Sequence, residues 1–170
     1  MAYWATYIAY DIHRAVAKEL INTAKIQLGQ LSKRISWLTP DYIHFTMHFL
    51  GWLTEEELIK VKKEILKYGN IDIILTQKTR GLGWKASDSY LALEIEKTSE
   101  LLESHSMIKR NLMLDNIVIK EQEFIPHISL GRIHPSFKEQ ILNTKLIIPN
   151  NKICDIKLSL FKSIENSKTL

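Results

Sequence analysis

The chain has 170 residues, of which 45% are apolar and 25% are charged, the balance of an ordinary soluble globular protein. This composition excludes disorder and collagen-like repetition, and the length suits one domain whose core needs no metal or disulfide. The single cysteine, Cys154, excludes an intrachain disulfide and a cysteine-based zinc site, and we interpret it as a buried structural thiol. The formal net charge of +4 fits an anionic ligand, although the lysines are scattered along the chain.

Residues 1–7 lack the basic segment and the long apolar segment of a secretory signal. No apolar run reaches the roughly 20 residues that a membrane-spanning helix needs. We therefore expect a cytoplasmic protein that does not bind a membrane, with a single domain over residues 1–170.

The first half of the chain predicts a strand, a helix and a second strand. Residues 3–10 are rich in aromatic and β-branched side chains and predict the first strand. Residues 13–30 carry an apolar side chain at every fourth position, which predicts a helix. Pro40 marks a break, because proline restricts the residue before it and cannot donate to a sheet. Residues 43–50 then alternate as a strand, which Gly51 ends.

Two capping-box patterns mark the starts of further helices. Thr54-Glu55-Glu56-Glu57 predicts a helix to about Tyr68, and Ser136-Phe137-Lys138-Glu139 predicts a short one. The remaining patterns predict a helix at 99–114 and strands at 71–77, 89–95, 116–120, 126–133 and 153–164. This order of elements, with hairpins that suit antiparallel pairing, indicates the α+β class.

Two segments of the chain resemble each other, because each places His-x-Thr/Ser within an alternating apolar stretch. They are His44-Phe45-Thr46 and His127-Ile128-Ser129. In a strand, residues i and i+2 share a face, so each histidine points the same way as its hydroxyl residue and the apolar residue between them points into the core. The pattern therefore predicts two imidazoles on rigid strands, each with a hydroxyl beside it.

Such a pair has a clear use in cleaving a phosphodiester. One histidine can take a proton from water while the other protonates the departing oxygen, since both have ordinary pKa values near 6.5. The hydroxyls can donate to the non-bridging phosphate oxygens, and no metal is needed. The pattern alone is weak: about one match is expected by chance, and His134-Pro135-Ser136 is a third match that Pro135 spoils as a strand motif.

The longer segments around these histidines resemble a known family. His44-Phe45-Thr46-Met47-His48-Phe49-Leu50-Gly51 and Pro126-His127-Ile128-Ser129-Leu130-Gly131-Arg132 are similar to the paired motifs H-x-T-x-x-F-L-G and P-H-x-[ST]-L-x-R of the LigT-like two-histidine (2H) phosphoesterases. The likeness covers essentially the whole chain, with Trp37 where the family often has tryptophan. Ser129 stands where threonine is commoner and keeps the hydroxyl, whereas strand 89–95 lacks the family's Pro-Arg lead-in.

The resemblance implies a fold and an activity. The fold is two pseudo-symmetric α+β lobes whose antiparallel sheets flank a central cleft. The activity is metal-independent hydrolysis of an RNA 2′,3′-cyclic phosphate to a 2′-phosphate, with His44 and His127 as the acid–base pair and no cofactor. A 2′-5′ phosphodiesterase or 2′-5′ RNA ligase remains open, as does an RNA-end-binding module without turnover, against which the intact pair speaks. The expected partners are RNA ends or small cyclic or 2′-5′ nucleotides, and the expected state is a monomer.

The resemblance also assigns Arg132 a phosphate contact. Strict alternation would put Arg132 on the face opposite His127, so this role needs a strand end or a bulge, which Gly131 could permit.

Four further residues have structural and functional interpretations. His48 would share the face of His44 in a straight strand, so it either lines the cleft or is a solvated histidine at the strand end. Tyr7 either stacks on a nucleobase or packs in the sheet. We expect Phe49 in the core and His105 at the surface of a helix.

Overall fold

The computed structural model describes residues 4–83 and 89–162. Within these residues strands and helices follow one another as expected for the α+β class. The strands are β1 (Trp4–Asp11), β2 (Ile35–Trp37), β3 (His44–Leu53), β4 (Ile71–Leu82), β5 (Tyr90–Ile95), β6 (His127–Ile133) and β7 (Lys152–Lys162). The helices are α1 (Arg14–Leu28), α2 (Glu55–Ile65), α3 (Ser99–Leu114) and α4 (Lys138–Asn143), with short 3₁₀ turns at Gly29–Arg34, Pro40–Tyr42 and Pro135–Phe137.

The seven strands of the described residues form one antiparallel sheet in the order β2-β6-β3-β1-β7-β4-β5. Because β5 also pairs with β6, the sheet closes on itself. Two pairings connect its halves. Strand β3 pairs with β6, and residues 71–74 of β4 pair with residues 152–156 of β7; beyond this stretch β4 pairs with β5 while β7 pairs with β1.

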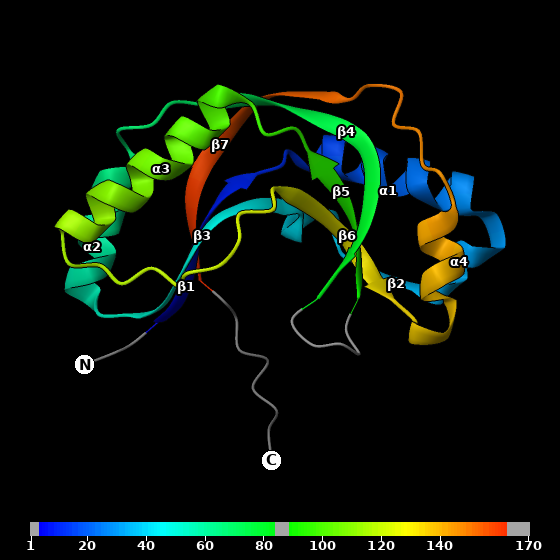
Figure 1. Cartoon of the computed structure of the whole chain (residues 1–170), viewed down its shortest axis with the longest axis horizontal. Helices are drawn as coiled ribbons and strands as arrows, with labels where there is room; N and C mark the ends of the chain where they lie inside the picture. Colours follow the sequence, from blue (N-terminus) through cyan, green and yellow to red (C-terminus); the bar gives the residue numbers. More distant parts are fainter. Residues whose placement is uncertain (1–3, 84–88, 163–170) are drawn as a thin grey trace, which may run out of the picture.

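The two expected lobes are present as the two halves of this sheet. In Figure 1, α2 and α3 lie at one end of the molecule, and α1 and α4 lie at the other, with the strands between them. The first half is built on the β1–β3 pair and the second on the β5–β6 pair. The expectation of two α+β lobes with antiparallel strands is confirmed, with the addition that the β3–β6 and β4–β7 pairings join them.

Local sequence signals account for several elements. Thr54 caps α2 as expected. Its hydroxyl accepts a hydrogen bond from the Glu57 amide, and the Glu57 carboxylate accepts one from the Thr54 amide. On α1 the buried residues recur every three or four positions and place one apolar face against the core; they are Ala17, Leu20, Ile21, Ala24 and Leu28. Strand β1 carries the fully buried Ile8 and Tyr10 into the same hydrophobic cluster.

Four expectations about individual elements are wrong. Gly51 does not end its strand, since β3 continues to Leu53. No strand forms at 116–120, because Asn116 takes a left-handed conformation (φ 62°) at the end of α3 and the chain then runs without regular structure to β6. The second capping box is absent. A 3₁₀ turn leads into α4, and the phenyl side chain of its N-cap, Phe137, cannot accept a hydrogen bond. Cys154 is exposed instead of buried, because a bulge with Asp155 at φ 58° interrupts the alternation of β7.

Candidate active site

The two His-x-Thr/Ser motifs lie side by side in the sheet. Phe45 of β3 and Ile128 of β6 are paired across the strands, and both side chains are fully buried. In each motif, the histidine before this buried residue and the hydroxyl residue after it point to the opposite face of the sheet. One cavity of about 260 Å³ is therefore lined by all four predicted catalytic residues, His44, Thr46, His127 and Ser129.

A bulge in β3 decides which side chains follow Thr46 on this face. Opposite β1, Ile8 pairs with His48 and Ala9 pairs with Thr46, so Met47 has no partner. An unpaired residue of this kind reverses the alternation beyond it. Met47 and His48 are consequently both buried, and Phe49 returns to the cavity face. The expectation that Phe49 packs in the core is therefore wrong.

The same bulge recurs in β6 at the equivalent position. Opposite β5, Leu91 pairs with Gly131 and Ala92 pairs with Ser129, which leaves Leu130 unpaired. Arg132 thus returns to the face of Ser129, is exposed, and lies opposite Tyr90, which lines the cavity. The bulge that a phosphate contact by Arg132 requires is present, but Arg132 does not line the catalytic cavity: it lines a separate hollow of about 320 Å³ beside β2.

Gly131 permits this arrangement because β2 passes very close to it. A Cβ atom on Gly131 would lie 2.6 Å from Ile35 Cγ2 and 2.9 Å from the Ser36 carbonyl oxygen. In the other half of the molecule, His48 occupies the equivalent position.

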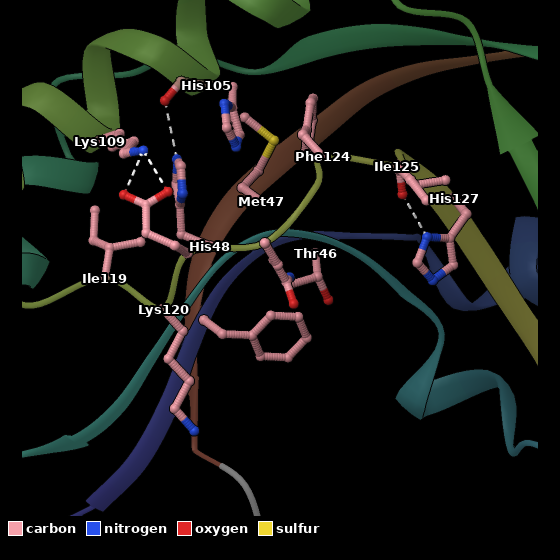
Figure 2. Close-up of a pocket in the computed structure, with 13 residues that line it drawn as sticks. Thr46, Met47, His48, His105, Lys109, Ile119, Lys120, Phe124, Ile125 and His127 are labelled. Carbon is pink, nitrogen blue, oxygen red and sulfur yellow. Dashed lines mark hydrogen bonds and ion pairs between the residues drawn. The ribbon is translucent and has the colours of Figure 1, made fainter. Parts of the chain in front are cut away.

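Both catalytic candidates are oriented by the same backbone contact. The Nδ1–H of His44 donates to the carbonyl of Tyr42 at 2.8 Å, and that of His127 donates to the carbonyl of Ile125 at 2.6 Å. The second of these bonds is drawn in Figure 2. A carbonyl oxygen can only accept, so the proton of each neutral ring sits on Nδ1. Each histidine is left with Nε2 as the nitrogen that can exchange a proton with a bound molecule.

Burial and charge make the two histidines an interacting pair. Burial lowers the pKa of His44 and that of His127, and the carbonyl acceptors partly oppose this effect. A positive charge on His127 lowers the pKa of His44 further, while the Asp11 carboxylate raises it. Protonation of His127 therefore disfavours protonation of His44.

Aromatic side chains form one wall of the cavity. Tyr7 lines the cavity and is half-buried. The centre of its ring lies 5.0 Å from that of His44, and the ring stacks on Phe161 with 5.3 Å between ring centres and 7° between the ring planes. Phe49 adds a third ring, 6.0 Å from that of Tyr7. Burial raises the pKa of Tyr7, so its hydroxyl stays protonated at neutral pH.

His48 does not line this cavity, so the expectation that it shares the face of His44 is wrong; it lines an adjoining pocket of about 40 Å³ that also includes Thr46 and His127. The bulge at Met47 turns the His48 side chain toward the opposite face of the sheet, and His48 is only 3% exposed there. Its Nε2–H donates to the His105 carbonyl at 3.0 Å, and its ring lies 4.1 Å from that of His105, which in turn stacks on Phe124 at 3.8 Å. Figure 2 shows His48 and His105 on the far side of Thr46 from His127. His105 is accordingly half-buried and not a surface residue.

Tyr90 lines the cavity and was missed, although the sequence contains a signal for it. Tyr7-Ile8-Ala9-Tyr10-Asp11 and Tyr90-Leu91-Ala92-Leu93-Glu94 share the pattern Tyr-x-Ala-x-acid, and Tyr90 follows Tyr7 by 83 positions. His127 follows His44 by the same 83 positions. Each pair of strands thus repeats one unit, in which an acidic residue lies opposite each histidine: Asp11 opposite His44 and Glu94 opposite His127.

An antiparallel α+β fold that holds two His-x-Thr/Ser strands around one cavity defines the class of two-histidine phosphoesterases. Comparison with known proteins agrees, although no family model matches the chain. An RNA 2′,3′-cyclic phosphodiesterase of Thermotoga maritima is 25% identical over 134 residues, which are 75% of this chain and 69% of that protein. One of Methanocaldococcus jannaschii is 29% identical over 133 residues, 75% and 70% of the two chains.

The solved structures give the same answer for the fold. Escherichia coli LigT in its apo form has a TM-score of 0.68 at 16% identity, covering 96% of this chain and 90% of that one. Its complex with 3′-AMP has a TM-score of 0.65 at 17% identity, covering 96% and 89%. Together the relatives and the fold support placing the chain in the LigT-like two-histidine phosphoesterase superfamily.

Two further observations concern the described residues alone. Residues 4–83 and 89–162 contain no group of three or more His, Cys, Asp or Glu side chains placed to hold a metal ion. None of the helices in this part of the chain is long and apolar enough to cross a membrane.

Proposed function

We propose that the protein hydrolyses RNA 2′,3′-cyclic phosphates to 2′-phosphates without a metal, with His44 and His127 as its acid–base pair. The observation that carries this proposal is the shared cavity, which both histidines line. Each histidine binds a backbone carbonyl through Nδ1, and each has a hydroxyl residue two positions further along its strand. The two relatives named RNA 2′,3′-cyclic phosphodiesterase support the substrate class, and LigT binding 3′-AMP agrees with a nucleotide ligand.

The proposed reaction uses each side chain once. Nε2 of His127 accepts a proton from water, the water oxygen attacks phosphorus, and the bond from phosphorus to the ribose 3′ oxygen breaks. Nε2 of protonated His44 gives its proton to that departing oxygen, which leaves the phosphate on the 2′ oxygen. The hydroxyls of Thr46 and Ser129 donate to the non-bridging oxygens, where charge accumulates, and Arg132 contacts the phosphate.

Product analysis on two substrates tests this proposal. An oligonucleotide ending in a 2′,3′-cyclic phosphate and a 2′-5′-linked oligoadenylate are each incubated with the protein in the presence of EDTA. We expect the first to yield a 2′-phosphate, with the activity lost in His44→Ala and His127→Ala and retained in the control His134→Ala. His134 is a suitable control because it is exposed and does not line the cavity.

Each other outcome contradicts a stated part of the proposal. Cleavage of the oligoadenylate alone would make the protein a 2′-5′ phosphodiesterase. Binding of the RNA end without turnover would make it a binding module. Activity that disappears with EDTA and returns with manganese or zinc would rule out the metal-independent reaction.

A further inference from the structure

A second and larger hollow adjoins the catalytic cavity. It lies between α1 and residues 37–40 and has a volume of about 760 Å³, against about 260 Å³ for the cavity. Leu38 lines both, so the two spaces adjoin at this residue. We call this hollow the α1 groove.

The α1 groove is basic. Its lining includes His13, Arg14, Lys18 and Lys25, and none of the described residues that line it is acidic. Asp41 approaches from outside and pairs with Arg14 at 3.3 Å, but both side chains are more than half exposed, so this pair is weak.

The charges on α1 are segregated toward this groove. All three of its cationic residues, Arg14, Lys18 and Lys25, line it, whereas the one acidic residue of the helix, Glu19, does not. The first turn has no acidic residue and begins with Arg14, although the positive end of the helix dipole disfavours a cation there. Helix stability therefore accounts for Lys25 in the last turn but not for Arg14 in the first.

The cations are spread along the groove. Arg14 and Lys25 are eleven residues apart on α1, which corresponds to roughly 16 Å along the helix axis. At the far end the Lys25 ammonium lies over the Trp37 ring, 5.5 Å from its centre, so a cation and an aromatic side chain meet there. A ligand that uses the whole groove is longer than a mononucleotide.

The near end of the groove begins beside the catalytic histidine. Asp11 at the end of β1 is paired with His44, and the amide of Ile12 donates to the carbonyl of Ile43. His13 and Arg14 follow directly and open the groove. A chain whose last phosphate occupies the cavity can thus continue along α1.

We propose that the α1 groove binds the RNA strand on the 5′ side of the terminal cyclic phosphate, so that oligonucleotides and not mononucleotides are the preferred substrates. This inference rests on the proposed function. A cyclic phosphate of this type terminates the 3′ end of its strand, so the rest of the strand lies on the 5′ side. Successive phosphates meet Arg14, Lys18 and Lys25, and a base drawn in with them lies beside Trp37.

Steady-state kinetics on two substrates test the inference. Adenosine 2′,3′-cyclic phosphate does not reach the groove, whereas a decanucleotide RNA with the same cyclic end does. For Lys18→Glu/Lys25→Glu we expect the KM of the decanucleotide to rise about 10- to 100-fold with kcat little changed, because two attractive interactions become repulsive. The kcat/KM of the mononucleotide should change less than about twofold. The slope of log KM against log salt should fall by about 1.4, which is about 0.7 for each phosphate that the protein no longer neutralises.

A matched variant separates the groove from overall charge. Lys62→Glu/Lys63→Glu changes the net charge equally on α2 in the other half of the molecule, where both lysines are exposed, and should leave the decanucleotide KM near the wild-type value. Lys18→Gln/Lys25→Gln should give a smaller rise than the charge reversal, and it serves if the reversed variant does not fold.

The failures are distinguishable. If the wild-type protein turns over neither substrate, the proposed function fails. If it turns over the mononucleotide and the groove variants keep the decanucleotide KM unchanged, or if the α2 variant raises it as much, the inference about the groove is overturned and the function stands.

Discussion

His48 is a buried titratable group that the proposed reaction does not use, and it should make the protein sensitive to acid. Burial lowers its pKa to about 4, and a positive charge on the neighbouring His105 acts in the same direction. In the unfolded chain the pKa returns to an ordinary value near 6.5. The folded protein therefore binds fewer protons than the unfolded chain between these values. The stability contributed by neutral His48 is fully present above about pH 6.5 and is lost as the pH falls toward 4.

The size of the effect follows from these two pKa values. Relative to pH 7.5, the free energy of unfolding should fall by about 2 kcal/mol at pH 5 and by about 3 kcal/mol at pH 4 through His48 alone. His44, His105 and His127 also have lowered pKa values, so the wild-type protein should lose more than this in total.

The substitution His48→Gln isolates the contribution. Glutamine does not titrate and can still donate to the His105 carbonyl, so at pH 7.5 we expect a cost of about 1 kcal/mol. Urea unfolding at pH 7.5 and pH 5 should show the variant losing about 2 kcal/mol less than wild type on acidification. The control His134→Gln changes an exposed histidine and should follow the wild-type curve. Parallel pH dependences of His48→Gln and wild type would refute the reasoning.

Two further predictions concern the cavity and the close approach of β2. Replacing Thr46 or Ser129 by Ala should lower kcat by about 10- to 1,000-fold, as for single oxyanion donors. Arg132→Ala should weaken substrate binding and turnover together. Wild-type kinetics in all three variants would show that the motif has only a structural role. Gly131→Ala should cost about 1–3 kcal/mol in urea unfolding because the added methyl group must displace β2, whereas Gly69→Ala meets no atom within 4 Å and should be near neutral; equal stabilities would contradict the packing.

Features determined by local sequence were predictable. The helix at 99–114 coincides with α3, and the Thr54 cap sets the start of α2, because propensity and capping act within a few residues. The positions of His44 and His127 on cavity-facing strands followed from alternation on either side of Phe45 and Ile128. The three-residue strand β2 was not found because so short a segment carries no periodic signal.

The residues after each motif could not be placed by alternation. The unpaired positions, Met47 and Leu130, are defined by registers with β1 and β5, which are distant in sequence. One missing pairing exchanges the faces of His48 and Phe49, so both expectations failed together. For Arg132 a bulge could be anticipated, because its expected role conflicted with strict alternation and Gly131 stood beside it. The repeat of Tyr7 and Tyr90 at the spacing of the histidines would have indicated equivalent geometry in both halves.

The two histidine motifs are nearly symmetric, so the acid and base roles of His44 and His127 depend on the residues that differ between the two halves. Each histidine faces an acidic residue across the strands, but the two acids differ in their surroundings. Glu94, opposite His127, forms an ion pair with Arg80 and accepts a bond from the Thr76 hydroxyl at 3.3 Å. Asp11, opposite His44, raises the pKa of that histidine. Only His44 thus gains a raising contribution from its opposite carboxylate, which supports the proposed assignment of His44 as the acid and His127 as the base.

A substrate with an activated leaving group separates these roles, because its departure needs no acid. His44→Ala and His127→Ala should each lower kcat on the RNA substrate by about 10²–10⁴-fold, and the double variant should be little worse than either, since the groups act as a unit. A p-nitrophenyl phosphodiester should rescue His44→Ala and not His127→Ala. The pH–rate profile should be bell-shaped, and Asp11→Asn should move its high-pH limb downward by lowering the pKa of the acid. Rescue of His127→Ala instead would reverse the assignment, and full activity in either single variant would end the two-histidine mechanism.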